Sequence, residues 1–212
     1  MRGRFLTLEG GEGAGKTAQA RRLAERLRDM GLRVTLTREP GGSPHAEDLR
    51  EIILSGRAAR FGAGAEALLF SAARIDHIDT TIEPALARGE WVISDRFADS
   101  TRAYQGAAGR LDLSFIRRLE QVAVGERRPE LTLILDLPPE QGLARANARR
   151  GAEPADRFER EGLLFHAALR KAFLEIAGEE PARCVVIDGG GTEAQVADAI
   201  WAAVVERLRI DA

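Results

Sequence analysis

The sequence is poor in cysteine and in long apolar runs, and each shortage excludes a class of protein. Its one cysteine, Cys184, permits no disulfide within the chain and lies in an apolar run, so we expect it to be a core residue. No apolar run approaches the ~18 residues that cross a bilayer, and residues 1–4 lead into the first apolar run without a signal segment. We therefore expect a cytoplasmic protein with no membrane partner.

The chain also lacks an excess of charge of either sign. Its net charge is −2, so no overall field attracts nucleic acid, and any bound anion must be held by local arginines. The basic residues are nearly all arginine, because Lys16 and Lys171 are the only lysines. With 212 residues, of which 44% are hydrophobic and 30% charged, the composition is typical of one globular domain, expected to span 1–212.

A glycine-rich loop is the first motif that is present. Residues 10–17 match Gly-x-x-x-x-Gly-Lys-[Ser/Thr] directly after an apolar run and before a helix expected over 18–30. The loop consists of Gly10, Gly11, Glu12, Gly13, Ala14, Gly15, Lys16 and Thr17. Its backbone N–H groups can surround a β-phosphate, Lys16 can reach the β and γ oxygens, and the Thr17 hydroxyl can bind Mg²⁺. The motif predicts a site for a nucleoside triphosphate.

Five short apolar runs alternate with amphipathic stretches, at 5–9, 33–37, 91–95, 131–136 and 184–188. This alternation predicts an α/β protein with a five-stranded parallel sheet and helices on both faces. Ligands of such sheets bind beyond the carboxyl ends of the strands. The loosest segment contains Gly151 and Pro154 and predicts a short lid at about 149–158.

The helix that begins near Ala65 has two distinct faces. Its predicted core stripe consists of Leu68, Ala72, Ile75, Ile78 and Ile82, and a second face holds Phe70, Arg74, His77 and Thr81. Phe70 and Arg74 can offer an aromatic plate and a guanidinium to a planar base. The alternative is that Phe70 packs under a loop. We expect His77 at the surface or on a polar face of the helix, without a metal partner.

Several blocks occur in an order that resembles bacterial thymidylate kinases. After the glycine-rich loop come Thr-Arg-Glu-Pro-Gly-Gly at 37–42, Phe-Ser-Ala-Ala-Arg at 70–74, Asp-Arg-Phe at 95–97, Ser-Thr-Arg-Ala-Tyr-Gln-Gly at 100–106 and Asp-Arg-Phe-Glu at 156–159. The resemblance implies transfer of the γ-phosphate of ATP to dTMP, which gives ADP and dTDP on the route to dTTP. It further implies a P-loop fold with a lid, and a homodimer.

The resemblance also implies which residues contact dTMP. Arg38 and Arg96 would grip its phosphate, and Phe70 would stack on thymine. The other implied contacts are Arg74 with the base, Ser100 and Thr101 with the thymine edge, Tyr104 with the 2′ position, Glu12 with the 3′-hydroxyl and Gln105 beside these groups. On the ATP side, Arg145 is the candidate to stack on adenine, and the residues from Gly189 onward are candidates to line it.

The chemistry agrees with these residues. A phosphate acceptor is already anionic and needs no general base, so repulsion among roughly six negative charges is the main obstacle. Lys16, Arg96, a lid arginine and Mg²⁺ can offset it. Asp95 and Asp136 both end a strand and compete for the Mg²⁺ role. We favour Asp95 for this role, because Asp136 could instead cap the helix that follows it. The alternative for Asp95 is a structural ion pair with Arg96 or Lys16.

Some positions leave alternatives open. Ala18 replaces a hydroxyl residue common in the family, which leaves one possible phosphate contact open. The lid is about two residues longer than usual, so the catalytic lid arginine is Arg149, Arg150 or Arg157. Gly13 follows Glu12, so the loop supplies no arginine for the transition state, and the lid must. We favour Arg150, because it directly precedes Gly151, the expected hinge of the lid. Two other functions share the glycine-rich loop. A GTP switch would need an Asn-Lys-x-Asp segment, which is absent, and a kinase for another small acceptor would not need Phe70 with Tyr104.

Overall fold

The structure is a computed structural model that describes residues 3–151 and 155–210. Its strands form one parallel sheet in the order β2-β3-β1-β4-β5. They are β1 Phe5–Gly10, β2 Val34–Arg38, β3 Trp91–Asp95, β4 Leu131–Asp136 and β5 Cys184–Asp188. The five predicted strands and their parallel arrangement are confirmed, with β1 one residue longer and β2 displaced by one residue.

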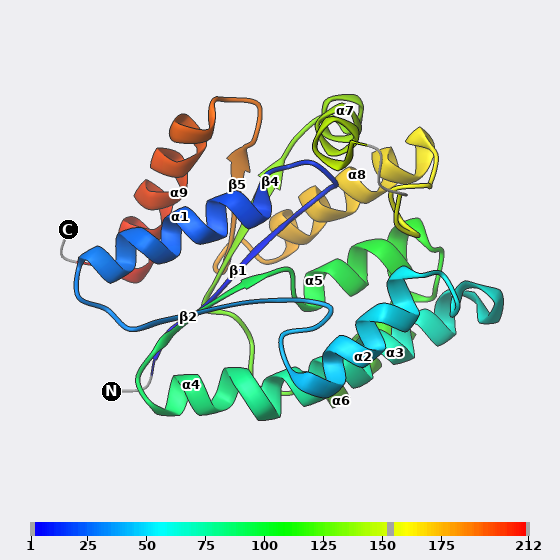
Figure 1. The fold of residues 1–212 in the computed structure, drawn as a ribbon, viewed down its shortest axis with the longest axis horizontal. Helices are drawn as coiled ribbons and strands as arrows, with labels where there is room; N and C mark the ends of the chain where they lie inside the picture. The colour runs from blue at the N-terminus through cyan, green and yellow to red at the C-terminus, as the bar shows by residue number, and fades with distance from the viewer. Residues whose placement is uncertain (1–2, 152–154, 211–212) are drawn as a thin grey trace.

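Helices connect the strands and cover both faces of the sheet (Figure 1). They are α1 Lys16–Asp29, α2 Pro44–Leu54, α3 Gly62–His77, α4 Glu83–Ala87, α5 Ala98–Thr101, α6 Leu113–Ala123, α7 Pro139–Arg150, α8 Leu163–Glu179 and α9 Glu193–Leu208. The described residues also contain one tighter helical turn, η1 Ala59–Phe61, and two wider, π-helical segments, η2 Ile78–Ile82 and η3 Arg102–Ala108. Within the described ranges, none of these helices is both long enough and apolar enough to cross a bilayer.

The core follows the two-residue alternation of the strands. On β1, Leu6 and Leu8 face α1 and α9, where Leu23 and Val204 belong to the same buried cluster. The alternate residues face the other side, where Phe5 packs edge-to-face against the ring of Phe97 at 4.9 Å. Cys184 is buried in the cluster formed with α8, as predicted. Both faces of β1 are thus buried, which places the loop after it on a rigid support.

The predicted core face of α3 was wrong. Leu68 and Ile75 are 53% and 40% exposed, although Ile78 and Ile82 beyond the helix are buried as predicted. His77, expected at the surface or on a polar face, is not at the surface: it lies on the polar face of α3 and is fully buried, with its Nδ1 3.0 Å from Glu39 Oε1 and its Nε2 2.7 Å from Thr37 Oγ1. The polar face of α3 is turned inward because its groups find polar partners there, and the apolar stripe is left outside.

Two glycines allow α7 to lie against the glycine-rich loop. A Cβ on Gly142 would lie 2.3 Å from the carbonyl oxygen of Glu12, and a Cβ on Gly13 would lie 1.9 Å from that of Gly142. Both obstacles are backbone atoms, which cannot rotate away. By contrast, a Cβ on Gly178 in α8 would meet no atom within 4 Å.

We therefore expect Gly142→Ala to lower the free energy of unfolding by about 1–3 kcal/mol, because the loop and α7 must separate to admit a methyl group. Gly178→Ala, the matched control, should be neutral or stabilising by about 0.4–1 kcal/mol, since it only restricts the unfolded chain. Urea unfolding of the two variants measures both changes. Equal stability of the two would contradict the close contact between α7 and the loop.

Candidate active site

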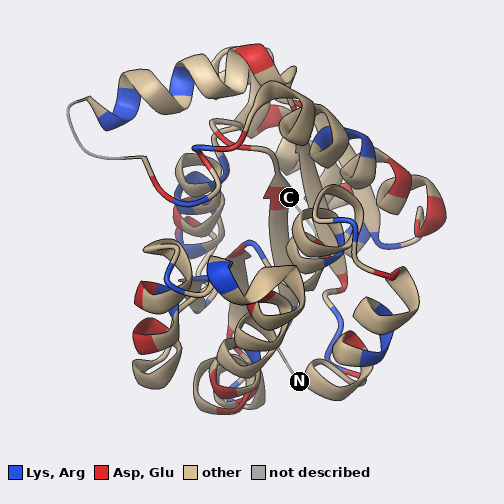
Figure 2. Ribbon diagram, turned by 90° about the vertical axis from the view of Figure 1, so that its right-hand side faces the viewer, with Lys and Arg blue, Asp and Glu red and all other residues tan. Residues whose placement is uncertain are grey.

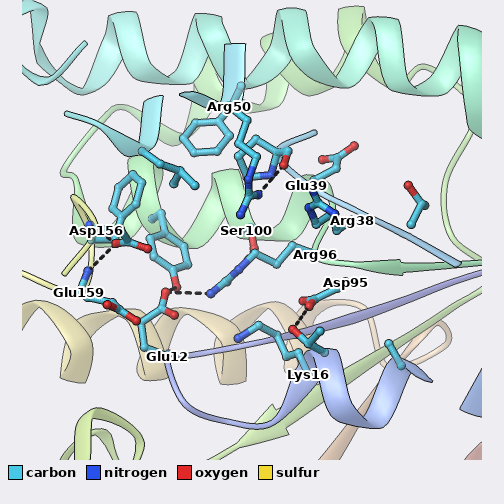
Figure 3. A pocket seen from close by; sticks show the side chains of 18 of the residues that line it. Glu12, Lys16, Arg38, Glu39, Arg50, Asp95, Arg96, Ser100, Asp156 and Glu159 are labelled. Carbon is cyan, nitrogen blue, oxygen red and sulfur yellow. Dashed lines mark hydrogen bonds and ion pairs between the residues drawn. The ribbon is translucent and has the colours of Figure 1, made fainter. Parts of the chain in front are cut away.

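A cavity of about 360 Å³ opens where β1, β2 and β3 end. Its lining comes from the glycine-rich loop, from the turns after β2 and β3, from α2 and α3, and from the segment after α7 (Figure 3). The predicted residues on its wall are Glu12, Gly13, Gly15, Lys16, Thr17, Arg38, Phe70, Asp95, Arg96, Ser100, Thr101, Tyr104 and Gln105. Elsewhere, basic and acidic residues are interspersed along the helices (Figure 2), so cations in the cavity itself must attract an anion.

The glycine-rich loop holds its lysine inside the turn. Lys16 Nζ donates to the carbonyl oxygens of Gly10 at 3.1 Å and of Gly11 at 2.6 Å. Gly13 and Gly15 have φ of 67° and 90°, the left-handed region that glycine enters without steric cost. Burial and the neighbouring Arg96 lower the pKa of Lys16 to about 8, although Glu12 and Asp95 oppose this. An ammonium so placed lies at the start of α1, where the free N–H groups of a helix attract phosphate.

The two residues predicted to bind Mg²⁺ contact each other. Thr17 Oγ1 donates a hydrogen bond to Asp95 Oδ2 (Figure 3). The competing carboxylate, Asp136, is engaged elsewhere, because Arg170 binds both of its oxygens at 2.7 and 2.8 Å. The interpretation of Asp136 as a helix cap was wrong, since no side chain caps α7, whose N-cap is Pro138. A hydroxyl and one carboxylate suit Mg²⁺, which prefers hard oxygen ligands and keeps waters and phosphate oxygens as the rest of its shell.

Arg96 is the central cation of the cavity. Its Nη2 lies 2.8 Å from Glu12 Oε1, its Nη1 donates to the carbonyl oxygen of Gly10 and to Ser100 Oγ, both at 3.2 Å, and its guanidinium lies over the ring of Tyr104. Burial opposes ionisation of Glu12, but Arg96, Lys16 and the Tyr104 hydroxyl lower its pKa to about 2. Arg96 thus belongs to a charge cluster in which Glu12 compensates it.

Two further arginines line the cavity beside Arg96. Arg38 is paired with Glu47, at 2.9 and 3.1 Å from its two carboxylate oxygens. Arg50 in α2 was missed by sequence reasoning; its Nη1 donates to the carbonyl oxygen of Pro40 at 2.6 Å. The one feature of the sequence that could have identified Arg50 is its position in the helix that directly follows the turn of Arg38. Arginines from two elements therefore face the same space as Arg96 (Figure 3).

The apolar end of the cavity is aromatic. Phe70 lines it and also lies 6.1 Å from the ring of Phe158, so this residue both faces the cavity and packs against another segment. Tyr104 packs edge-to-face against Phe158 at 5.3 Å, and its hydroxyl donates to Glu12 Oε1 at 2.5 Å. These contacts join the phosphate loop to the aromatic end.

Arg74 does not line the cavity, although we predicted that it contacts a base. It is 3% exposed, and its Nε donates to Glu39 Oε2 at 2.8 Å. Its Nη2 donates to Thr101 Oγ1 at 3.1 Å and to the carbonyl oxygen of Phe97 at 3.2 Å. Arg74 therefore lies behind Thr101, a residue that does line the cavity.

The predicted lid arginines have different surroundings. Arg150 ends α7 and donates to Glu159 Oε2 and to Asn147 Oδ1, both at 2.7 Å. Arg149 lines the cavity and is 65% exposed, whereas Arg157 pairs with Glu66 and Glu161. Residues 152–154 of the predicted lid lie outside the described residues.

The remaining predicted ATP residues lie away from the cavity wall. Gly10, Gly11 and Ala14 form the back of the loop, where Gly10 and Gly11 present their carbonyls to Lys16. Arg145 Nη1 donates to the carbonyl oxygen of Gly189 at 2.9 Å. The two predicted adenine contacts thus lie side by side, on α7 and after β5.

A parallel sheet with a glycine-rich loop after β1, a buried lysine in that loop and arginines facing it defines a P-loop kinase, an enzyme that transfers phosphate from ATP. A family model described as thymidylate kinase matches residues 8–200. The chain is 58% identical over 211 residues to a thymidylate kinase of Rhodopseudomonas palustris, covering 99% of this chain and 91% of that one. It is 54% identical over 207 residues to one of Bradyrhizobium diazoefficiens, covering 98% and 91%.

A solved structure agrees with these sequence matches. The crystal structure of thymidylate kinase from Ehrlichia chaffeensis superposes with a TM-score of 0.76 at 31% identity, covering 96% of this chain and 99% of that one. The chain therefore belongs to the thymidylate kinase family. Its membership confirms the resemblance that the sequence blocks indicated.

Glu9 is a second residue that sequence reasoning missed. It is fully buried at the end of β1, where its carboxylate accepts hydrogen bonds from Phe97 N at 2.7 Å, Ser100 N at 3.2 Å and Ser100 Oγ at 2.6 Å. Burial and the nearby Asp99 raise its pKa to about 7, although Ser100 and Arg96 oppose the shift. A glutamate in an apolar strand is the signal that could have found it.

This pKa predicts a pH dependence of stability. Between about pH 4.5 and 7 the native protein retains a proton on Glu9 that the unfolded chain loses, so the contribution of Glu9 to stability falls as pH rises through this window. Glu9→Gln does not titrate and should gain stability relative to the wild type as pH rises from about 5 to about 8. Urea unfolding at several pH values measures this difference. A difference that stays constant with pH would contradict it.

Proposed function

We propose that this enzyme transfers the γ-phosphate of ATP to dTMP, giving ADP and dTDP. One observation carries the proposal: the phosphate-loop lysine, the arginine cluster of Arg38 and Arg96, and the aromatic ring of Phe70 line a single cavity. A nucleotide that laid its base on Phe70 would present its phosphate to the arginines beside the loop. Membership of the thymidylate kinase family supports this choice of acceptor.

The reaction needs positioned cations more than proton transfer. The dTMP phosphate is already anionic and attacks the γ-phosphorus directly, so no general base is required. Lys16 binds the β and γ oxygens of ATP, and Arg38 and Arg96 hold the acceptor phosphate in line. Thr17 and Asp95 would hold Mg²⁺, which neutralises charge on the donor phosphates when bound. Lys16 and Arg96 lie near each other in the structure, with Glu12 beside Arg96.

The nucleoside end selects deoxyribose and thymine. Phe70 stacks on the base, and Ser100, Thr101 and Gln105 line its edge. Arg74 is fixed by Glu39 and supports this edge through Thr101. Because the Tyr104 hydroxyl is bound to Glu12, its ring is fixed near the sugar, where it crowds a 2′-hydroxyl, while Glu12 reaches the 3′-hydroxyl.

A panel of acceptors tests the proposal. dTMP should have the highest kcat/KM, and dUMP should be about tenfold or more slower, since one methyl contact is lost. UMP should be slower still, because its 2′-hydroxyl meets Tyr104. A coupled assay of ADP release with each acceptor measures these values. If UMP or CMP matched dTMP, the enzyme would be a kinase for another acceptor.

The charge that stabilises the transition state comes, we propose, from Arg150. In the described structure it is bound to Glu159 and Asn147, and it must leave them to reach the phosphates. Arg150→Ala should lower kcat at least about a hundredfold with little change in the KM for dTMP. Arg160→Ala is the matched control, because Arg160 is an exposed arginine of the same segment. Normal turnover by Arg150→Ala would assign the role to Arg149, which lines the cavity, or to Arg157.

We also propose that the enzyme is a homodimer built on α3. Leu68, Ala72 and Ile75 are exposed and recur at the spacing of one helical face. Val122 on α6, the helix that packs beside α3, is 78% exposed. A contiguous apolar stripe of this kind marks an interface, and a second copy of the chain covers it in the two-fold arrangement that is commonest among homo-oligomers.

A further inference from the structure

The backbone of Arg96 has an unusual conformation that the structure holds in place. Its φ of 73° lies in the left-handed region, which residues other than glycine rarely adopt. Arg96 N donates to the carbonyl oxygen of Leu8 at 2.9 Å, and the carbonyl oxygen of Arg96 accepts from Ser94 Oγ at 2.7 Å. The next N–H along the chain, that of Phe97, donates to the Glu9 carboxylate at 2.7 Å. Glu9 thus closes the turn on its C-terminal side.

Glu9 is also connected, through Ser100, to the guanidinium end of the Arg96 side chain. Its Oε2 accepts from the Ser100 hydroxyl at 2.6 Å, and the same oxygen of Ser100 accepts from Arg96 Nη1 at 3.2 Å. Because the single proton of the hydroxyl is committed to Glu9, the lone pairs of Ser100 Oγ are turned toward the guanidinium. The carboxylate therefore constrains Arg96 at two points: at its backbone, through the N–H of Phe97, and at its guanidinium, through Ser100.

We propose that Glu9 is the positioning residue of Arg96 and, through it, sets the preference of the acceptor site for a phosphorylated nucleoside over an unphosphorylated one. The inference rests on the proposed role of Arg96 as a ligand of the acceptor phosphate. Glu9 itself does not line the cavity. Its effect is transmitted by the turn at residues 95–97 and by Ser100.

The chemistry of the position favours this role over simple filling of the core. On the opposite face of β1, Leu6 and Leu8 are fully buried in an apolar cluster, yet the fully buried Glu9 is a carboxylate. Among the described residues it forms no ion pair within 4 Å, so its three hydrogen bonds carry its compensation. An apolar side chain would leave the N–H groups of Phe97 and Ser100 unpaired, and both belong to the segment that places Arg96.

The decisive measurement compares the affinities of dTMP and thymidine, which differ by the phosphate that Arg96 is proposed to bind. Glu9→Met keeps the approximate volume and removes all three hydrogen bonds. It should lower the ratio of dTMP to thymidine affinity at least about tenfold, because hydrogen bonds that place a charged group are the strong ones. Thymidine affinity and the KM for ATP should change less than about twofold. The affinities are measured by calorimetry at about pH 8, where Glu9 is mostly ionised because its pKa is about 7.

Glu9→Gln is a more conservative variant that tests the same positioning role. Its amide can still accept from the two backbone N–H groups but cannot also accept the Ser100 proton, so the affinity ratio should fall about threefold, an intermediate loss. Thr7→Val is the matched control on the same strand: it removes the buried hydrogen bond to Thr132 Oγ1 at 2.9 Å, which does not involve Arg96. Its affinity ratio should equal that of the wild type.

The outcomes separate this inference from the proposed function. If the wild type does not phosphorylate dTMP, the proposed function fails. If the wild type turns over dTMP and folded Glu9→Met keeps the affinity ratio within about twofold, the inference on Glu9 is wrong. Should Glu9→Met not fold, Glu9→Gln decides: an unchanged ratio overturns the inference, and a loss confined to dTMP supports it. An equal loss of dTMP and thymidine affinity would assign Glu9 a purely structural role.

Discussion

The site depends on burying two cations side by side before any phosphate is present. Lys16 is 7% exposed and the side chain of Arg96 is 16% exposed, and the charge of Arg96 lowers the pKa of Lys16. Glu12 makes this possible, because its carboxylate lies against Arg96 and within the field of Lys16, which hold its pKa at about 2. One carboxylate beside two cations offsets part of the penalty of burying them, because neither cation is left without a nearby negative charge. The glycine-rich loop and the turn after β3 are therefore coupled through a single carboxylate.

Carboxylates take the place of phosphate around the rest of the cavity as well. Glu47 accepts from Arg38, and Glu159 accepts from Arg150. Arg150 and Glu159 are largely shielded from solvent, but the Arg38–Glu47 pair is open to it, and exposed ion pairs contribute little to stability. Exchange of such a pair for an arginine–phosphate contact therefore costs little, and the gain comes from the bidentate geometry that a guanidinium and a phosphate share. The same reasoning explains why acidic residues line a cavity built for anions.

The sequence was sufficient for the sheet and the phosphate loop, because both depend on local patterns. Apolar runs marked all five strands, and the loop motif carries its own geometry. The face of α3 was not predictable in this way, since periodicity locates an apolar stripe without saying what covers it. Leu68 was left exposed because His77 and Arg74 on the opposite side found Glu39. Such partners come from distant segments, and no local pattern records them.

The residues that the sequence did not reveal share one property: they act by contact with a distant segment. Glu9 meets Phe97 and Ser100 across the gap between β1 and the turn after β3, and Arg50 meets Pro40. Each is a charged residue in an element whose pattern assigned it no role. For Glu9, a charged residue in an apolar strand is a better guide to the supporting contact than any motif, although it does not identify the partner.

The choice of arginine over lysine follows from the same burial. Burial and the charge of Arg96 lower the pKa of Lys16 to about 8, so its ammonium begins to lose its proton just above neutral pH. Burial acts in the same direction on Arg96, but Tyr104, Glu12 and Asp95 outweigh it and raise its pKa. A guanidinium therefore stays charged in a cavity that would partly neutralise an ammonium. The one lysine of the site lies where bound triphosphate itself restores its charge, and every other cation that faces the cavity is an arginine.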